Sequence, residues 1–115
     1  GKRRVKTRLA VLALVVACAG AGAAAPVKPQ VGLVCEAVYL PARTTWVRRV
    51  EIDYGEQRVS GVRIDGVPVY GFSVEGTVIL TAVDNERIQI DVAAQSWQSD
   101  FRGQASSQGR CERAR

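Results

Sequence analysis

Side chains alternate between apolar and polar along most of the chain after residue 31. From residue 46 to residue 54, one side of an extended segment would carry Trp46, Arg48, Val50, Ile52 and Tyr54. The same alternation returns in residues 87–92 and 97–102, and no helical period appears in this region. A period of two places successive side chains on opposite faces of a strand, so the pattern predicts an all-β domain.

Short turn signals separate the alternating segments. Asp65-Gly66 is the clearest, because it predicts a two-residue hairpin loop that pairs Ile64 with Val67. Glu75-Gly76 predicts a second hairpin, which would pair Val74 with Thr77, and longer turns are expected at 55–57 and 84–86. Connections this short make neighbouring strands antiparallel, so we expect a meander that closes into a small barrel or folds into a sandwich. About eight strands are predicted, near 32–39, 45–54, 58–64, 67–74, 77–83, 87–94, 96–103 and 106–112.

The middle of the chain is apolar on both predicted faces. One face would carry Val62, Ile64, Val67, Val69, Val78, Leu80 and Ala82, and the other Val59, Tyr70, Phe72, Val74, Ile79 and Val83. A register error, a bulge near Gly71 or a covering loop would each explain this pattern. The alternative is an exposed apolar patch, around Tyr70, Phe72 and Ile79, that binds a protein partner or a second copy. Pro68 has no N–H to donate, which predicts an edge or bulge position.

Two of the three cysteines, Cys35 and Cys111, lie near the two ends of the predicted domain. In an oxidising compartment they are expected to form a disulfide that ties the first strand to the last, rather than to remain as two free buried thiols. Closing a loop of about 77 residues would stabilise the fold by at most about 4.5 kcal/mol.

Residues 1–25 have the order of charge and apolarity that is typical of an export signal. Basic residues from Lys2 to Arg8 precede an apolar segment, Leu9–Val16, and small residues follow as far as Ala25. Leu9–Ala25 is short and weakly apolar for a membrane span, which needs about 20 residues. Either a peptidase cuts near Ala23 or Ala24, or Val15-Val16-Ala17-Cys18 is a lipobox and Cys18 is lipidated. Residues 26–31 would then be a linker and 32–115 the all-β domain of a periplasmic, secreted or lipid-anchored protein.

Charge and residue types exclude several classes of function. The net charge of +5 comes from the leader, because residues 26–115 carry Lys28 and ten Arg against eleven acids. The predicted domain is therefore not expected to bind nucleic acid. The chain has no His, which removes His-based catalytic triads and most zinc sites. Carboxylates are spread singly, and Arg48, Arg49 and Arg63 are expected to be solvated and paired with neighbouring acids. We expect no enzyme activity, no metal and no cofactor.

Ser60-Gly61-Val62-Arg63-Ile64 matches the first two positions of a Ser-Gly-x-x-Tyr loop, with Ile64 in place of the aromatic residue. With the leader, the possible lipobox and a Cys near each end, the layout from Cys35 to Cys111 resembles the membrane-bound and periplasmic inhibitors of c-type lysozyme. The resemblance implies an exported antiparallel β-domain in which Ser60 and Gly61 belong to the inhibitory loop. From the residues alone, Ser60-Gly61 is also typical of a strand bulge.

The sequence therefore predicts a non-enzymatic envelope protein that acts as a protein-binding or structural module, and an inhibitor is one such module. The candidate partner-binding residues are Ser60, Gly61, Tyr70, Phe72 and Ile79. A small-ligand-binding β-barrel is the alternative, and lysozyme inhibition is a third. The expected partner is another protein or a second copy, and contact with a membrane is expected only through a lipid on Cys18.

Overall fold

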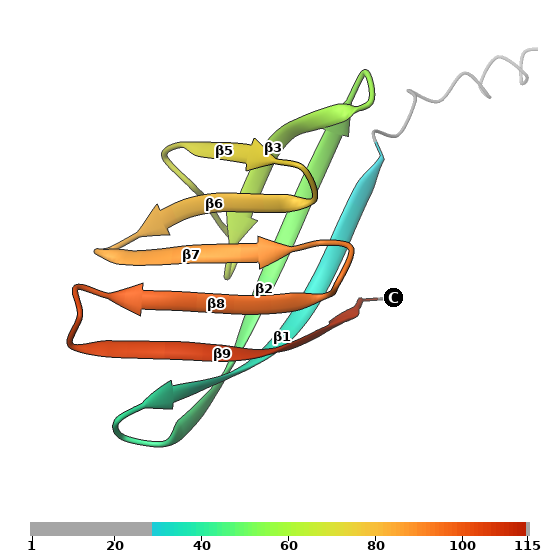
Figure 1. The fold of residues 1–115 in the computed structure, drawn as a ribbon. Helices are drawn as coiled ribbons and strands as arrows, with labels where there is room; N and C mark the ends of the chain where they lie inside the picture. Colours follow the sequence, from blue (N-terminus) through green and yellow to red (C-terminus); the bar gives the residue numbers. More distant parts are fainter. Residues whose placement is uncertain (1–28, 115) are drawn as a thin grey trace, which may run out of the picture.

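The structure is a computed structural model that describes residues 29–114. These residues form β-strands joined by short turns, which confirms the all-β prediction (Figure 1). The strands are β1 (Gln30–Leu40), β2 (Thr44–Gly55), β3 (Arg58–Ile64), β4 (Val67–Pro68), β5 (Phe72–Glu75), β6 (Val78–Val83), β7 (Glu86–Asp91), β8 (Ser96–Phe101) and β9 (Ala105–Arg113). The predicted signal, Cys18 and the first half of the predicted linker, residues 26–28, lie outside the described residues. No helix within 29–114 is long and apolar enough to cross a membrane.

All nine strands belong to one antiparallel sheet with the order β4-β3-β2-β1-β9-β8-β7-β6-β5. The sheet curls into a half-barrel, so that β1–β3 cross behind β5–β9 in Figure 1. Strands that follow each other in the chain pair with each other, except β4 and β5, and β1 pairs with β9. The fold is therefore a meander in which the first and last strands, β1 and β9, pair in the middle of the sheet. The two edge strands, β4 and β5, follow each other in the chain but do not pair, and we call the gap between them the open seam.

The prediction of a single strand over 67–74 is wrong, because the open seam divides this segment. Val69, Tyr70 and Gly71 lie in no strand, and they separate β4 from β5. The break resets the alternation, because the faces of β4 and β5 are not linked by a continuous pleat. Ile64 and Ile79, which were assigned to opposite faces, both lie in one core. An irregularity near Gly71 therefore explains why the segment reads as apolar on both sides.

One of the two predicted hairpin registers is confirmed, and the other is wrong. Ile64 pairs with Val67, as the Asp65-Gly66 signal predicts. The second register is wrong, because Glu75 pairs with Val78 and the loop is Gly76-Thr77 rather than Glu75-Gly76. Gly76 takes a φ of 61° at the first position of this loop, a conformation that glycine adopts without strain.

The concave face of the sheet carries the core. Trp97 is its largest fully buried side chain. The other members come from both halves of the sheet: Leu33, Cys35, Ala37, Val50, Ile52, Val62, Ile64, Ile79, Ile88, Ile90 and Cys111. Cys35 and Cys111 are directly paired across β1 and β9 and form the predicted disulfide. The bond therefore links the two strands at which the ends of the meander meet.

Candidate functional site

One end of the half-barrel contains a cavity of about 560 Å3 between the two halves of the sheet. Its wall combines aromatic side chains with a group of charged ones. The lining residues are Tyr39, Trp46, Val47, Arg48, Asp65, Val83, Asp84, Glu86 and Phe101. We call this cavity the aromatic mouth, after Tyr39, Trp46 and Phe101.

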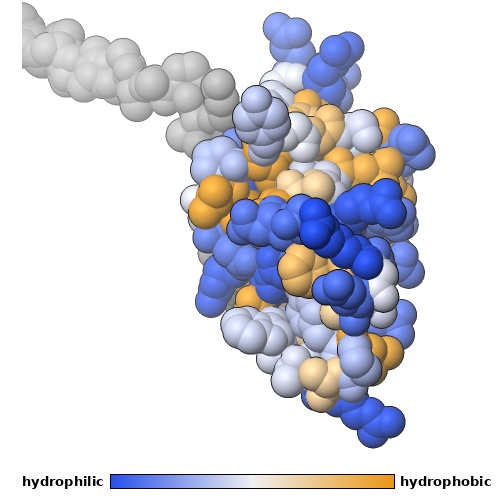
Figure 2. Space-filling model, turned by 90° about the vertical axis from the view of Figure 1, so that its left-hand side faces the viewer, coloured by the Kyte–Doolittle hydropathy of each residue, from blue (hydrophilic) through white to orange (hydrophobic). Residues whose placement is uncertain are grey.

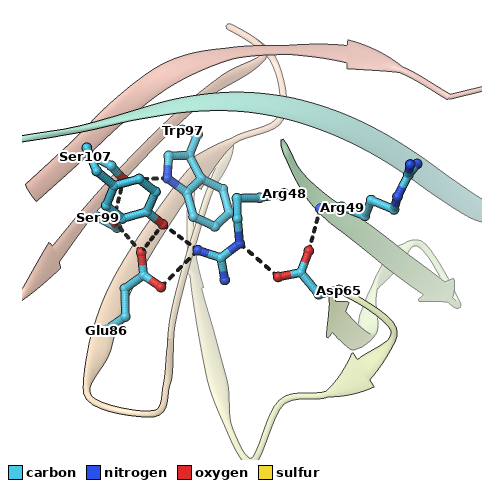
Figure 3. A network of polar contacts seen from close by, with 8 residues as sticks. Arg48, Arg49, Asp65, Glu86, Trp97, Ser99 and Ser107 are labelled. Atoms are coloured by element: carbon cyan, nitrogen blue, oxygen red, sulfur yellow. Dashed lines mark hydrogen bonds and ion pairs between the residues drawn. The ribbon is translucent and has the colours of Figure 1, made fainter. Parts of the chain in front are cut away.

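The alternation of β2 places Arg48 on the inner side of the sheet. Arg48 lies between Trp46 and the buried Val50 in the register that faces the core, and its side chain is only 13% exposed. Its Nη1 lies 2.9 Å from Oε1 of Glu86, and its Nε lies 2.8 Å from Oδ2 of Asp65 (Figure 3). The guanidinium also lies 4.9 Å from the centre of the Trp97 ring, which adds a cation–π contact. Arg48 therefore contacts carboxylates from two different elements and covers one end of the core.

The carboxylate of Glu86 accepts hydrogen bonds from side chains on several strands. Its Oε2 accepts a hydrogen bond from the Tyr39 hydroxyl at 2.5 Å and another from Ser99 Oγ at 2.7 Å. The Ser99 and Ser107 hydroxyls are hydrogen-bonded to each other, and Trp97 Nε1 donates to Ser107 Oγ at 2.8 Å. The network therefore joins β1, β2, β7, β8 and β9 at the floor of the mouth (Figure 3).

The network keeps its two central groups charged. Burial by itself opposes the charge of Arg48, but hydrogen bonds to Glu86 and Asp65 outweigh it and raise the pKa of the guanidinium. Burial likewise opposes the charge of Glu86, but hydrogen bonds from Ser99, Tyr39 and Arg48 lower the pKa of its carboxyl group. Burial and the nearby Glu86 raise the pKa of Tyr39. All three pKa values are moved away from neutral pH. A general acid or base requires a pKa close to the pH at which it acts.

The rim of the mouth is apolar and open to solvent. Trp46 is 62% exposed although it stands in the inward register of β2, and Phe101 and Val47 are also exposed. Figure 2 views the molecule from the side of the turns at 84–85 and 102–104, where apolar groups form separate patches among hydrophilic ones. An exposed Trp beside a fixed Arg is typical of binding surfaces, in which Trp, Tyr and Arg are enriched.

Ser60 and Gly61 lie at a β-bulge in β3. Asp53 pairs with Gly61 and Tyr54 pairs with Val59, so Ser60 is the extra residue. Its hydroxyl donates to the Asp53 carbonyl at 3.2 Å. The bulge allows Val59 and Val62, which are three positions apart, to contact the same core. Ser60–Ile64 therefore runs as a strand, and Ile64 at its end is buried.

The structure separates the three apolar residues proposed for partner binding. Tyr70 is fully exposed in the segment between β4 and β5, and Phe72 is partly buried against the core. Ile79 is 1% exposed and belongs to the core, so it is not available at the surface. Cys18 lies outside the described residues.

None of the residues that line the aromatic mouth is among the predicted site residues. Arg48 was expected to be a solvated strand charge, and Glu86 was placed in a turn. Arg48 does pair with Asp65, and Arg63 with Glu51 at 2.7 Å, as expected for the strand charges. However, Arg48 is largely buried rather than solvated. The turn before β7 is formed by Asp84 and Asn85, which both have a positive φ, so Glu86 is the first residue of β7 and not part of the turn. The available signal was a lone charged residue on the apolar side of an alternating segment.

Comparisons of the chain with protein-family models, with curated proteins and with solved structures give no match. Within residues 29–114, no three Cys, Asp or Glu side chains gather in a way that could hold a metal ion.

Proposed function

We propose that this protein is a non-enzymatic, exported module that binds a protein partner at the aromatic mouth. The observation that carries the proposal is the exposure of Trp46 next to Arg48, whose guanidinium is fixed by two ion pairs. A large aromatic side chain held in water at a concave site is stabilised when a partner covers it. The Cys35–Cys111 disulfide is compatible with an oxidising compartment and supports the export part of the proposal.

The network beneath the rim favours binding over catalysis. Arg48 and Glu86 are already paired and hydrogen-bonded, so they need not reorganise when a partner arrives. A preformed floor of this kind reduces the entropy cost of association. Three apolar side chains of the lining, Trp46, Val47 and Phe101, are exposed to solvent, and a protein partner would cover them together.

The test is photo-crosslinking followed by affinity measurement. A photoreactive amino acid at position 46 of the full chain should capture a specific partner in the cell envelope, and mass spectrometry identifies it. The purified partner is then titrated against the unmodified protein and against Trp46→Ala. We expect the substitution to weaken binding by about 2 kcal/mol or more, the range of interface hot spots.

The matched control is Val67→Ala, because Val67 is about as exposed as Trp46 but does not line the mouth. Both variants should unfold at the same urea concentration as the unmodified protein. Equal affinity of the partner for Trp46→Ala and the unmodified protein would overturn the proposal.

A further inference from the structure

The half-barrel has a second cavity at the end opposite the aromatic mouth. Its volume is about 650 Å3, within the range of about 300–1,000 Å3 found for small-molecule sites. The lining residues are Tyr54, Gln57, Arg58, Val59, Val74, Gly76, Thr77, Ile79, Val92, Ala93 and Arg113. We call it the terminal cavity, because both ends of the described chain lie on this side of the molecule (Figure 1).

The terminal cavity spans the open seam of the sheet. Val59 comes from β3 and Val74 from β5, and these two strands do not pair with each other. On the β3 side, β4 pairs only with Arg63 and Ile64, so the first part of β3 has no strand on that edge. The meander therefore leaves unfilled space between β3 and β5, and branched aliphatic side chains face that space.

The cavity combines apolar walls with two cations at its rim. Val59, Val74, Ile79 and Val92 supply aliphatic surface, and Tyr54 is the single aromatic residue in the lining. Arg113 follows Cys111 in the inward register of β9 and is paired with the buried Leu33, so its side chain stands on the concave side. Arg58 lies at the start of β3 on the same rim.

Among residues 29–114, these two cations have no anionic partner at the site. The lining contains no Asp or Glu, and neither Arg58 nor Arg113 forms an ion pair with another residue in 29–114. At the other end of the barrel, Arg48 has two carboxylates. Two unopposed guanidinium groups above an aliphatic cavity are complementary to a molecule with an apolar chain and one negative head group.

We propose that the terminal cavity binds a single-chain anionic amphiphile, with the aliphatic chain against Val59, Val74 and Ile79 and the head group between Arg58 and Arg113. This inference does not depend on the proposed function, because the aromatic mouth shares no lining residue with the terminal cavity. A fatty acid and a lipid-derived phosphate share this chemistry, so both head groups belong in the test.

The experiment titrates four probes with the same ten-carbon chain into the purified protein, below the concentrations at which they form micelles. The probes are decanoate, decyl phosphate, decanol and decyltrimethylammonium, and calorimetry reports their affinities. We expect saturable binding of the anions and at least tenfold weaker binding of decanol, because decanol lacks the charge-assisted hydrogen bonds. Decyltrimethylammonium should bind no better than decanol. Tighter binding of decanoate would indicate a fatty acid, and tighter binding of decyl phosphate a phosphate-bearing lipid.

Variants and chemical shifts locate the site. Arg113→Gln should weaken decanoate binding about tenfold and leave decanol binding unchanged. Arg110→Gln is the matched control, because Arg110 is exposed on the opposite face of the same strand. Amide shifts caused by decanoate should centre on Val59, Gly76 and Val92 and spare Trp46. The inference is overturned if decanoate does not saturate, if decanol binds equally well, if both arginine variants behave alike, or if the shifts centre on the aromatic mouth.

Discussion

Glu86 is held by donors from three neighbouring residues inside the half-barrel, and this arrangement has a consequence for acid stability. Its pKa is lowered in the folded protein from the ordinary value of 4.5. A carboxyl group with a lowered folded-state pKa stabilises the fold above its unfolded pKa, and this contribution is lost as the pH falls toward the folded-state pKa. The free energy of unfolding should therefore decrease as the pH drops below about 4.5.

The substitution Glu86→Gln removes the titrating group and leaves Arg48 with Asp65 as its remaining acidic partner. We expect a loss of about 2–3 kcal/mol in the free energy of unfolding at pH 7, measured by urea titration. The difference from the unmodified protein should shrink as the pH falls from 4.5 toward the folded-state pKa of Glu86, because protonation of Glu86 removes the charge that the variant lacks. Glu112→Gln, on the exposed side of β9, is the control. A difference that stays constant from pH 7 to pH 3 would contradict this account.

Gly109 permits the close approach of β9 and β1. It pairs with Trp97 on one side and Ala37 on the other, and a Cβ at this position would lie 1.7 Å from the carbonyl oxygen of Glu36. Because the obstacle is backbone in the middle of the sheet, it cannot move aside as a flexible side chain could. Gly109→Ala should therefore lower the free energy of unfolding by about 3 kcal/mol or more.

Gly71→Ala provides the comparison for Gly109→Ala. Gly71 has no heavy atom within 4 Å of the added Cβ and no positive φ. Its substitution should leave the urea midpoint within experimental error of the unmodified protein. Equal effects of the two substitutions would show that the contact between β9 and β1 is looser than described.

Among the elements, the connection between β7 and β8 depends on one carboxylate. Oδ1 of Asp91 accepts hydrogen bonds from the amides of Ala93 and Ala94 and from the hydroxyl of Thr77, at 2.9–3.0 Å. The amide of Ala94 and the Thr77 hydroxyl are the main causes of the lowered pKa of Asp91. Asp91 therefore links the 92–95 turn to the loop between β5 and β6.

Asp91→Ala should free this turn without disturbing the core. We expect faster hydrogen exchange at Ala93 and Ala94, because their amides lose their acceptor. Exchange at Ile88 and Ile90 should not change. Asp100→Ala is the control, since Asp100 accepts a hydrogen bond from the amide of Gly103 in the next turn. Unchanged exchange at Ala93 and Ala94 would mean that Asp91 does not hold the turn.

The disulfide between Cys35 and Cys111 closes the meander across its first and last strands. Cys35 and Cys111 are 76 positions apart in the chain and directly opposite in the sheet. Their bond restricts the unfolded chain over most of the domain, and the loop-entropy model assigns it at most about 4.5 kcal/mol. A domain of this size buries a limited core, so a loss of that order is a large part of its stability.

The double variant Cys35→Ala, Cys111→Ala should unfold at a clearly lower urea concentration than the oxidised protein. Adding a reductant should shift the oxidised protein toward the variant and should not affect the variant itself. If reduction and substitution both leave the midpoint unchanged, the pairing of β1 with β9 alone is sufficient to close the sheet.

The parts of the fold that follow local rules could be predicted from the sequence. Alternation identified most strands, because side-chain direction in a strand depends only on neighbouring residues. Asp65-Gly66 predicted the pairing of Ile64 with Val67, because a two-residue loop sets the register of its own hairpin. The disulfide followed from the position of Cys35 and Cys111 near the ends of an antiparallel domain, and the structure confirms it.

Other features were decided by contacts between distant segments. The break at Val69–Gly71 and the bulge at Ser60 reset the alternation so that both halves of the sheet face one core. Ser60-Gly61 and Gly71 indicated where a bulge could lie, but only the pairing of distant strands decided which faces these irregularities bring together. Arg48 and Glu86 are 38 positions apart, and the curled sheet brings them within 2.9 Å of each other, which helps to stabilise the burial of both charges. The sequence alone therefore determined the strands, the first hairpin register and the cysteine pair, whereas the tertiary structure decided the two cavities, because their walls come from strands that only the curvature of the sheet brings together.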